Sequence, residues 1–168
     1  IMIKAMQNAE KYGVEIYAVA TSQEEIGLRG ATTSAFGINP DVGICLDTTL
    51  ATDTPGVNDR EKITELGEGT AIKIFDSSAI QHPKLVKFLQ DLADKREIPW
   101  QHEILPRGGT DSAAMQKSRA GVPVATISTP TRYIHSSVET INKSDLKGSV
   151  DLITAFIEEG HQANLELA

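Results

Sequence analysis

The sequence contains a single cysteine, Cys45, among its 168 residues. One cysteine cannot form an intramolecular disulfide, so no disulfide framework holds this fold and a reducing compartment is favoured. Cys45 lies between Ile44 and Leu46, and we expect its thiol to be packed in the protein rather than nucleophilic. The chain is the length of one domain, and we expect a cytoplasmic protein with a single hydrophobic core.

Basic clusters and long apolar runs are also missing. The formal net charge is -7, and the lysines and arginines neither cluster nor alternate with aromatic residues, which argues against a nucleic-acid-binding surface. No window is long and apolar enough to cross a bilayer, and no signal-peptide pattern opens the chain. We therefore expect neither a nucleic-acid partner nor a membrane partner.

The sequence instead alternates β-branched apolar runs with segments of helical periodicity, which predicts an α/β fold. A helix over residues 1–11 has no residue that could cap its start, so we expect that the helix, and the protein, begin upstream of this sequence. Strands are predicted at residues 14–21, 42–46, 71–75, 100–105 and 122–128. Further helices are predicted at residues 28–38, after Pro83, at 110–120, and from about Ser144 to Gly160.

Polar side chains follow the predicted strands, where ligand sites of α/β sheets are usually found. These residues are Glu24, Glu25, Asp47, Gly109, Thr110, Asp111 and His135. Carboxylates that gather without a cation repel one another and raise each other's pKa. We therefore expect a divalent metal ion among them, with zinc, cobalt or manganese as the candidates.

The adjacent carboxylates Glu24 and Glu25 suit two separate tasks. In an extended segment their side chains point in opposite directions, so one can coordinate a metal ion while the other handles a proton. A glycosidase needs two carboxyl groups that face each other across a sugar, roughly 5 Å or more apart. A Glu-Glu dipeptide is poorly placed for that geometry.

Five blocks of the sequence, in order, resemble the glutamyl and leucyl aminopeptidases of metallopeptidase family forty-two, the tetrahedral, cellulase-M-like enzymes. The blocks are residues 23–31 (QEEIGLRGA), 46–56 (LDTTLATDTPG), 74–78 (IFDSS), 106–111 (PRGGTD) and 132–136 (RYIHS). The resemblance implies a zinc-peptidase-like catalytic domain with a mixed, mostly parallel sheet flanked by helices. It also implies peptide substrates and a homo-oligomer, a dodecamer in the family.

The resemblance further implies a role for each matched residue in a site with two divalent metal ions. Glu24 matches the general base that activates the attacking water. Glu25 and His135 match ligands of one metal ion, and Asp47 matches a ligand of the other. Gly109, Thr110 and Asp111 match a segment that supports the substrate side of the cleft.

The family pattern also contains a histidine and an aspartate ligand that precede the Glu-Glu block and are absent from this sequence. Three of the five expected ligands are therefore present. The family's inserted oligomerisation domain would also lie upstream. We expect residues 1–168 to be the carboxyl-terminal part of a metallo-aminopeptidase catalytic domain.

Simpler interpretations remain for each of these residues. The glutamate pair could form a solvated turn, Asp47 could cap a turn with Thr48, and His135 could be a hydrogen-bonded loop histidine. Two alternative functions also remain. One is a metal-independent endo-1,4-β-glucanase, a label that some relatives carry, and the other is a non-catalytic remnant of an aminopeptidase.

Overall fold

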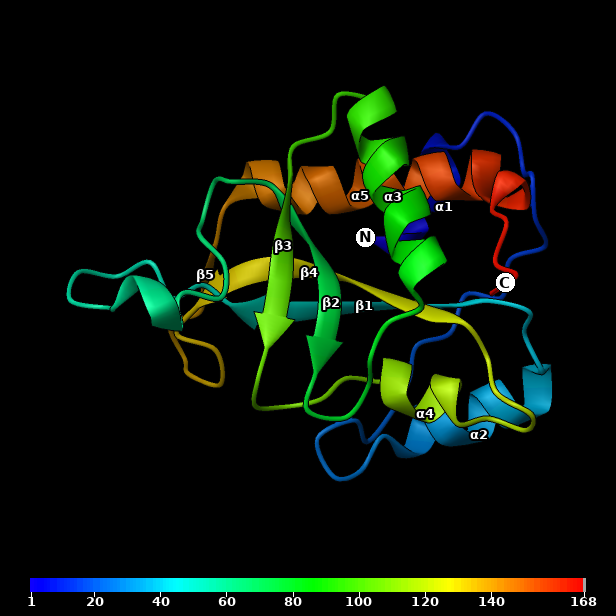
Figure 1. The fold of residues 1–168 in the computed structure, drawn as a ribbon, viewed down its shortest axis with the longest axis horizontal. Coiled ribbons are helices and arrows are strands. Elements are labelled where there is room, and N and C mark those ends of the chain that lie inside the picture. The colour runs from blue at the N-terminus through cyan, green and yellow to red at the C-terminus, as the bar shows by residue number, and fades with distance from the viewer. Residues whose placement is uncertain (168) are drawn as a thin grey trace.

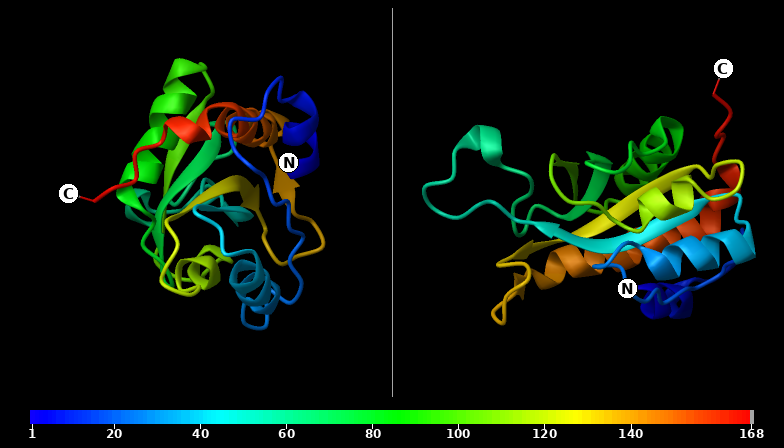
Figure 2. Two further views of the ribbon diagram at one scale, coloured as in Figure 1. Left: turned by 90° about the vertical axis from the view of Figure 1, so that its right-hand side faces the viewer. Right: turned by 90° about the horizontal axis from the view of Figure 1, so that it is seen from below.

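The computed structural model of the protein describes residues 1–167, which form one twisted sheet with helices on both faces (Figure 1 and Figure 2). The strand order is β1-β4-β2-β3, and β5 pairs with β4. This arrangement confirms the predicted α/β class. The strands are β1 (Gly43–Leu50), β2 (Thr70–Asp76), β3 (Trp100–Leu105), β4 (Val124–Arg132) and β5 (Thr140–Ile141).

The sheet is mixed and mostly parallel, as expected. Strand β1 runs parallel to β4, and β2 runs parallel to β3. The two pairs meet through a short antiparallel contact between β2 and β4, where Ala71 faces Ser128 and Ile72 faces Ile127. Figure 1 shows how strongly the sheet twists, because β2 and β3 run across the direction of β1 and β4.

The helices form two layers, with α1, α3 and α5 on one face of the sheet and α2 and α4 on the other (Figure 2). Helix α4 is shorter than the predicted 110–120. It ends at Gln116, and Arg119, in a left-handed conformation with φ of 50°, prevents the helix from resuming before Gly121. The helices are α1 (Met2–Asn8), α2 (Arg29–Ile38), α3 (Pro83–Lys95), α4 (Ser112–Gln116) and α5 (Lys143–Glu159), with 3-10 turns at Asp59–Glu61 and Gly160–Gln162.

The strand predicted at residues 14–21 is wrong. This segment is extended but joins no strand of the described sheet. Tyr17 and Val19 are exposed, at 61% and 39%. The β-branched composition favours a strand, but a strand forms only where a second backbone supplies the hydrogen-bonding partner. Within residues 1–167 no backbone pairs with this segment.

Helix α3 begins where the sequence predicts it. Pro83 occupies the first helical turn, and His82 precedes it as the N-cap, with its Nδ1 accepting from the Leu85 amide at 3.4 Å. A proline at the first turn costs no hydrogen bond, because that amide has no partner in a helix. The role of His82 is therefore structural.

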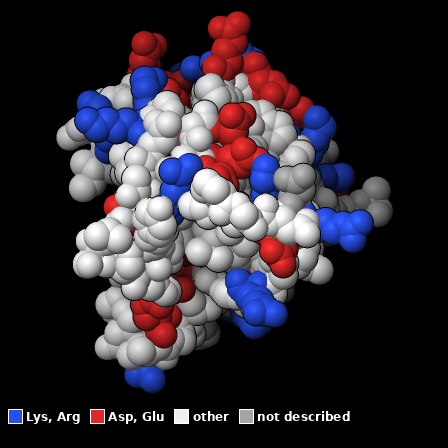
Figure 3. All heavy atoms as spheres, turned by 90° about the vertical axis from the view of Figure 1, so that its left-hand side faces the viewer, with Lys and Arg blue, Asp and Glu red and all other residues white. Residues whose placement is uncertain are grey.

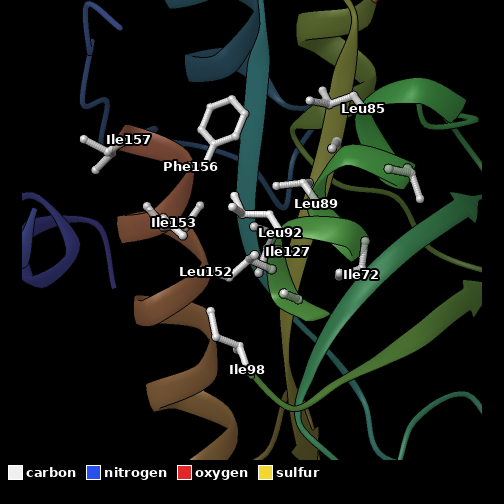
Figure 4. Packing of buried hydrophobic residues seen from close by; sticks show 14 of the residues in the cluster. Ile72, Leu85, Leu89, Leu92, Ile98, Ile127, Leu152, Ile153, Phe156 and Ile157 are labelled. Carbon is white, nitrogen blue, oxygen red and sulfur yellow. The ribbon is translucent and has the colours of Figure 1, made fainter. Parts of the chain in front are cut away.

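The hydrophobic core lies between helices α3 and α5 and one face of the sheet. In Figure 4 the apolar side chains of the two helices point toward each other and toward Ile72 and Ile127 of the sheet. Each fully buried Leu or Ile contributes about 1.5–3 kcal/mol by leaving water. The helical members of this cluster include Leu85, Leu89, Leu92, Leu152, Ile153, Phe156 and Ile157.

The opposite face of the sheet is polar and lies under helix α4. Side chains alternate along β1, so Ile44 and Leu46 pack against the apolar core, while Cys45 and Asp47 point the other way. Gly43 marks this second face, because a Cβ atom there would lie 3.0 Å from the Met115 sulfur of α4. The sheet therefore separates an apolar layer from a polar one.

An ionic contact joins the ends of helices α3 and α5. Glu159 is 6% exposed, and its carboxylate accepts from the Lys95 ammonium at 2.6 Å and from Arg96. These donors, Lys95 first, lower the pKa of Glu159 to about 2. Arg96 also contacts Glu158 at 2.9 Å. The two helices are thus held together by charge as well as by the apolar core.

The surface carries charges of both signs. Figure 3 shows acidic and basic side chains interspersed on the face that carries β5, with no continuous basic patch among the described residues of that face. Within residues 1–167, none of the helices has the length and apolar character needed to cross a membrane.

The lowered pKa of Glu159 predicts a pH-dependent contribution to stability. Its folded pKa lies below the ordinary 4.5, so the contribution is present above pH 4.5 and is lost as the pH falls toward 2. We expect Glu159→Gln to lower the free energy of unfolding by on the order of 1 kcal/mol at pH 7, and by less at pH 3. Urea unfolding at both pH values measures this, with Asp151→Asn as the control for an exposed pair. An equal loss of unfolding free energy at both pH values would contradict a lowered pKa of Glu159.

Candidate active site

The adjacent glutamates lie on a hydrogen-bonded turn, not on the extended segment that we expected. The Glu24 carbonyl accepts from the amides of Gly27 at 3.0 Å and Leu28 at 2.9 Å. Gly27 and Leu28 have φ values of 119° and 55°, and α2 begins at the next residue. The left-handed conformation suits glycine at the first of these positions. The turn, rather than strand pleating, sets the directions of the two carboxylates.

Glu25 contacts His135. The His135 Nε2 lies 2.9 Å from the Glu25 Oε1, and both side chains are about 70% exposed. His135 comes from the turn between β4 and β5, and its amide donates to the Glu139 carboxylate at 2.7 Å. The fold therefore brings the QEE block and the RYIHS block together.

Glu24 lies in the field of an acidic cluster. Desolvation raises its pKa, and the charges of Asp47, Glu25 and Asp111 raise it further, while His135 opposes them. A carboxyl group whose pKa is raised in this way holds a proton more readily than one in water. This property suits a group that takes up and releases a proton during a reaction.

Asp47 lies within β1 rather than after it. Its Oδ1 accepts from the Thr48 amide at 2.7 Å, but both residues lie in the strand, so Asp47 does not cap a turn. Desolvation raises the pKa of Asp47, whereas the Thr48 amide and the Lys73 charge lower it. Cys45, two residues earlier, is 5% exposed, and burial raises the pKa of its thiol to about 12. The thiol is therefore packed and un-ionised, as predicted.

The segment after β3 returns beneath the polar face of the sheet. Because β2 runs antiparallel to β4 and parallel to β3, the carboxyl end of β3 does not lie at the same edge of the sheet as those of β1 and β4. Asp111 instead joins the acidic cluster around Glu24 because the loop after β3 leads back to the polar face of the sheet. Its Oδ2 accepts from the Thr21 hydroxyl at 2.6 Å, while its buried Oδ1 has no hydrogen-bond partner in the described structure.

Gly109 and Thr110 fix the course of this returning segment. A Cβ atom at Gly109 would lie 2.5 Å from the Ser78 hydroxyl, so only glycine allows this close approach. The Thr110 hydroxyl donates to the Asp76 Oδ2 at 3.2 Å. Both residues therefore tie the loop before α4 to the end of β2.

A buried ionic cluster lies beside Asp47 and was not predicted from the sequence. The Lys73 ammonium lies 3.0 Å from Glu103 and 3.3 Å from Asp76, and its side chain is fully buried. The Thr49 hydroxyl donates to the same Glu103 oxygen at 2.6 Å. The signal was present, because a lysine between Ile72 and Ile74 in an apolar strand requires a buried partner.

The donor chemistry at the site fits part of a divalent metal site. Glu25 and His135 offer an oxygen and a nitrogen ligand within contact of each other, and the unpartnered Asp111 oxygen indicates a missing positive group. A catalytic zinc site typically has three protein ligands. Among residues 1–167, however, no three His, Cys, Asp or Glu side chains form a group that could hold a metal ion.

Comparison with known families decides the ancestry of this arrangement. Residues 1–152 match the model of the M42 glutamyl aminopeptidases. The chain belongs to this family. A lysyl aminopeptidase of Pyrococcus furiosus is 43% identical over 160 residues, which cover 94% of this chain and 44% of the relative. The chain spans about half the length of the curated relatives it matches.

Solved structures of M42 relatives share the fold. An aminopeptidase from Desulfurococcus kamchatkensis superimposes with a TM-score of 0.92 and 48% identity, covering 94% of this chain and 45% of that one. Pyrococcus horikoshii TET1 peptidase, which can assemble into a tetrahedron or a large octahedral shell, has a TM-score of 0.71 and 34% identity over 83% of this chain and 39% of its own. A Thermotoga maritima structure named as an endoglucanase has a TM-score of 0.62 and 30% identity, covering 84% of this chain and 40% of that one.

The buried position of Lys73 predicts a large effect of its removal. Lys73→Met leaves the carboxylates of Glu103 and Asp76 without their cation, and we expect it to lower the free energy of unfolding by about 3–5 kcal/mol. Chemical denaturation measures this loss. Lys147→Met, which removes a lysine from an exposed pair on α5, is the matched control. A loss at Lys73 no larger than that of the control would show that the cluster is not essential.

Proposed function

We propose that this chain provides part of the catalytic centre of a metal-dependent aminopeptidase that removes amino-terminal residues from peptides. The observation that carries the proposal is the contact between Glu25 and His135, 2.9 Å apart, beside a Glu24 whose pKa is raised. Membership of the M42 family supports it. The curated relative from Pyrococcus furiosus acts, by its name, as a lysyl aminopeptidase.

Each residue of the site has a proposed role. Glu25 and His135 bind one divalent ion, and Asp47 binds a second, with zinc, cobalt or manganese as candidates. When bound, these ions supply Lewis-acid polarisation of the scissile carbonyl and of the attacking water. Glu24 takes a proton from the water and passes it to the leaving amine, a task for which a raised pKa suits it.

The loop before α4 supports the substrate side of the site in this proposal. Gly109 keeps the loop close to Ser78, Thr110 ties it to Asp76, and Asp111 stands beside Glu24. A loop held in this way keeps its position when a peptide enters, which lowers the entropic cost of binding.

The proposal requires ligands from outside residues 1–168, because the described residues do not form a complete metal site. We propose that these residues are the carboxyl-terminal part of a longer catalytic domain, whose upstream part supplies the remaining histidine and aspartate. Since Pyrococcus horikoshii TET1 assembles into shells, we also propose that the complete protein is a cytoplasmic homo-oligomer.

Metal content tests the ligand assignment directly. In a longer protein that contains these residues and supplies the remaining ligands, we expect cobalt to be retained after loading and desalting. We expect Glu25→Ala in that protein to bind cobalt with an affinity more than about tenfold lower, because changes outside the ligand set already cost tenfold or more. Elemental analysis measures bound cobalt per chain, and Glu24→Gln is the matched control that should retain the wild-type content. Equal retention in Glu25→Ala, or no retention in the wild-type longer protein, contradicts the ligand assignment.

Turnover tests the role of Glu24. In the metal-loaded protein, Glu24→Gln should lower kcat by about 10²–10⁴-fold with unchanged metal content, because an amide cannot accept the proton. A panel of aminoacyl substrates measures hydrolysis, and Glu15→Gln, which changes an exposed glutamate, is the control. Unchanged activity in Glu24→Gln would exclude it as the base.

The same assays separate the two alternatives. A metal-independent glucanase, the activity named for the Thermotoga maritima structure, would hydrolyse cellulose oligomers in the presence of a chelator. A non-catalytic remnant would hydrolyse neither peptides nor oligosaccharides with any metal.

A further inference from the structure

His135 occupies a conformationally costly turn. Tyr133 and His135 both adopt left-handed backbone conformations, with φ values of 61° and 63°, which residues with a Cβ atom seldom adopt. The two side chains are largely exposed, so burial does not hold them in place. Something else must keep this turn in the geometry that directs the imidazole toward Glu25.

Arg132 anchors the start of the turn. It is the last residue of β4. Its guanidinium donates two hydrogen bonds to the Asp53 carboxylate, from Nε to Oδ1 at 2.6 Å and from a terminal nitrogen to Oδ2 at 2.8 Å. The Asp53 side chain is only 9% exposed. A two-point contact between planar groups fixes orientation as well as distance.

Asp53 is itself held on a rigid base. Its Oδ2 also accepts from the Leu66 amide at 2.9 Å. The neighbouring backbone is closed by a bridge between Ala51 and Thr64 and by a hydrogen bond from the Thr52 amide to the Thr64 carbonyl at 3.0 Å. The carboxylate therefore offers Arg132 a fixed point outside the β4–β5 hairpin.

The far side of the turn is closed by β5. Arg132 pairs with Thr140 in the antiparallel ladder, and the Glu139 carboxylate accepts from the His135 amide at 2.7 Å. The turn is thus fixed at both ends. Arg132 contributes to both, through its side-chain contact with Asp53 and its backbone pairing with Thr140.

We propose that the Asp53–Arg132 pair positions His135, by fixing the end of β4 so that the left-handed turn presents the imidazole to Glu25. Arg132 is a positioning residue and does not touch the reacting groups. The consequence for metal binding rests on the proposed function, whereas the effect on the orientation of His135 does not.

The test uses the full 168-residue chain without metal at one fixed pH. Imidazole proton and nitrogen NMR signals of His135 report its contact with Glu25. Arg132→Lys keeps the charge but removes the two-point contact, and Asp53→Asn keeps the shape but removes the charge. We expect either variant to move the His135 signals at least halfway to those of a short peptide with the same turn sequence. The signals of His82 at the start of α3 should not move.

Combining the two changes provides a second criterion. If the side chains act as a pair, the double variant should move the His135 signals no further than either single variant does. Asp53→Glu retains a carboxylate for Arg132, and we expect it to restore a substantial part of the wild-type signal position. Additive shifts in the double variant would overturn the proposal.

Arg96→Lys is the matched control, because it weakens another arginine–carboxylate contact, between α3 and α5. It should lower the Tm without moving the His135 signals. The proposal is overturned if Arg132→Lys and Asp53→Asn lower the Tm but leave His135 unchanged, or if Arg96→Lys moves His135 equally. If Arg132→Lys does not fold, Asp53→Asn alone decides between these outcomes.

Adding cobalt in a second arm separates this inference from the proposed function. If the wild type in the longer protein binds cobalt, Arg132→Lys should weaken its affinity by about 10–100-fold, as is usual for residues that orient a ligand. If the wild type in the longer protein binds none, the ligand assignment fails while the metal-free NMR result stands. Equal cobalt affinity in wild type and Arg132→Lys, with the His135 signals moved in the metal-free protein, would overturn the ligand role of His135 and not its positioning by Arg132.

Discussion

The buried ammonium group of Lys73 is the interaction on which the rest of the structure depends. It compensates Glu103 of β3 and Asp76 at the end of β2, and all three side chains are hidden from water. Thr49 of β1 donates to the same Glu103 oxygen. The cluster therefore links β1 and β3, which lie at the two ends of the strand order β1-β4-β2-β3. A buried ammonium group such as that of Lys73 is tolerated only when carboxylates such as Glu103 and Asp76 compensate its charge, so the fold must bring these side chains together.

This cluster places a polar network beneath the candidate site. Asp76 also receives the Thr110 hydroxyl, so the loop that carries Asp111 is tied to the same group of charges. The Lys73 charge lowers the pKa of Asp47, while burial raises it. The site therefore collects carboxylates above a sheet face that contains its own fixed cation. The apolar face of the same sheet packs against α3 and α5 and provides most of the burial.

Local patterns predicted most of the elements. The strand at 100–105 agrees with β3 at both ends, and Pro83 correctly marked the start of α3. The strand predicted at residues 14–21 was wrong, because a strand needs a neighbouring backbone to pair with and amino-acid composition does not reveal whether one is present. Helix α4 was predicted too long, because it ends at Gln116 and the left-handed conformation of Arg119 prevents it from resuming. The mixed, mostly parallel sheet agrees with the resemblance, but the periodicity of apolar residues contains no information about which neighbouring strands run antiparallel.

The sequence by itself determined the family and the α/β class, and it nominated the acidic and histidine side chains of the candidate site. These follow from ordered motifs and from the period of apolar residues, both of which are local properties. Only the tertiary structure decided that Glu25 touches His135, that Asp111 accepts from Thr21, and that Asp53 holds Arg132. Each of these contacts joins segments distant in the sequence, and their geometry is set by sheet twist, strand direction and buried charge pairing, which act only once the chain has folded.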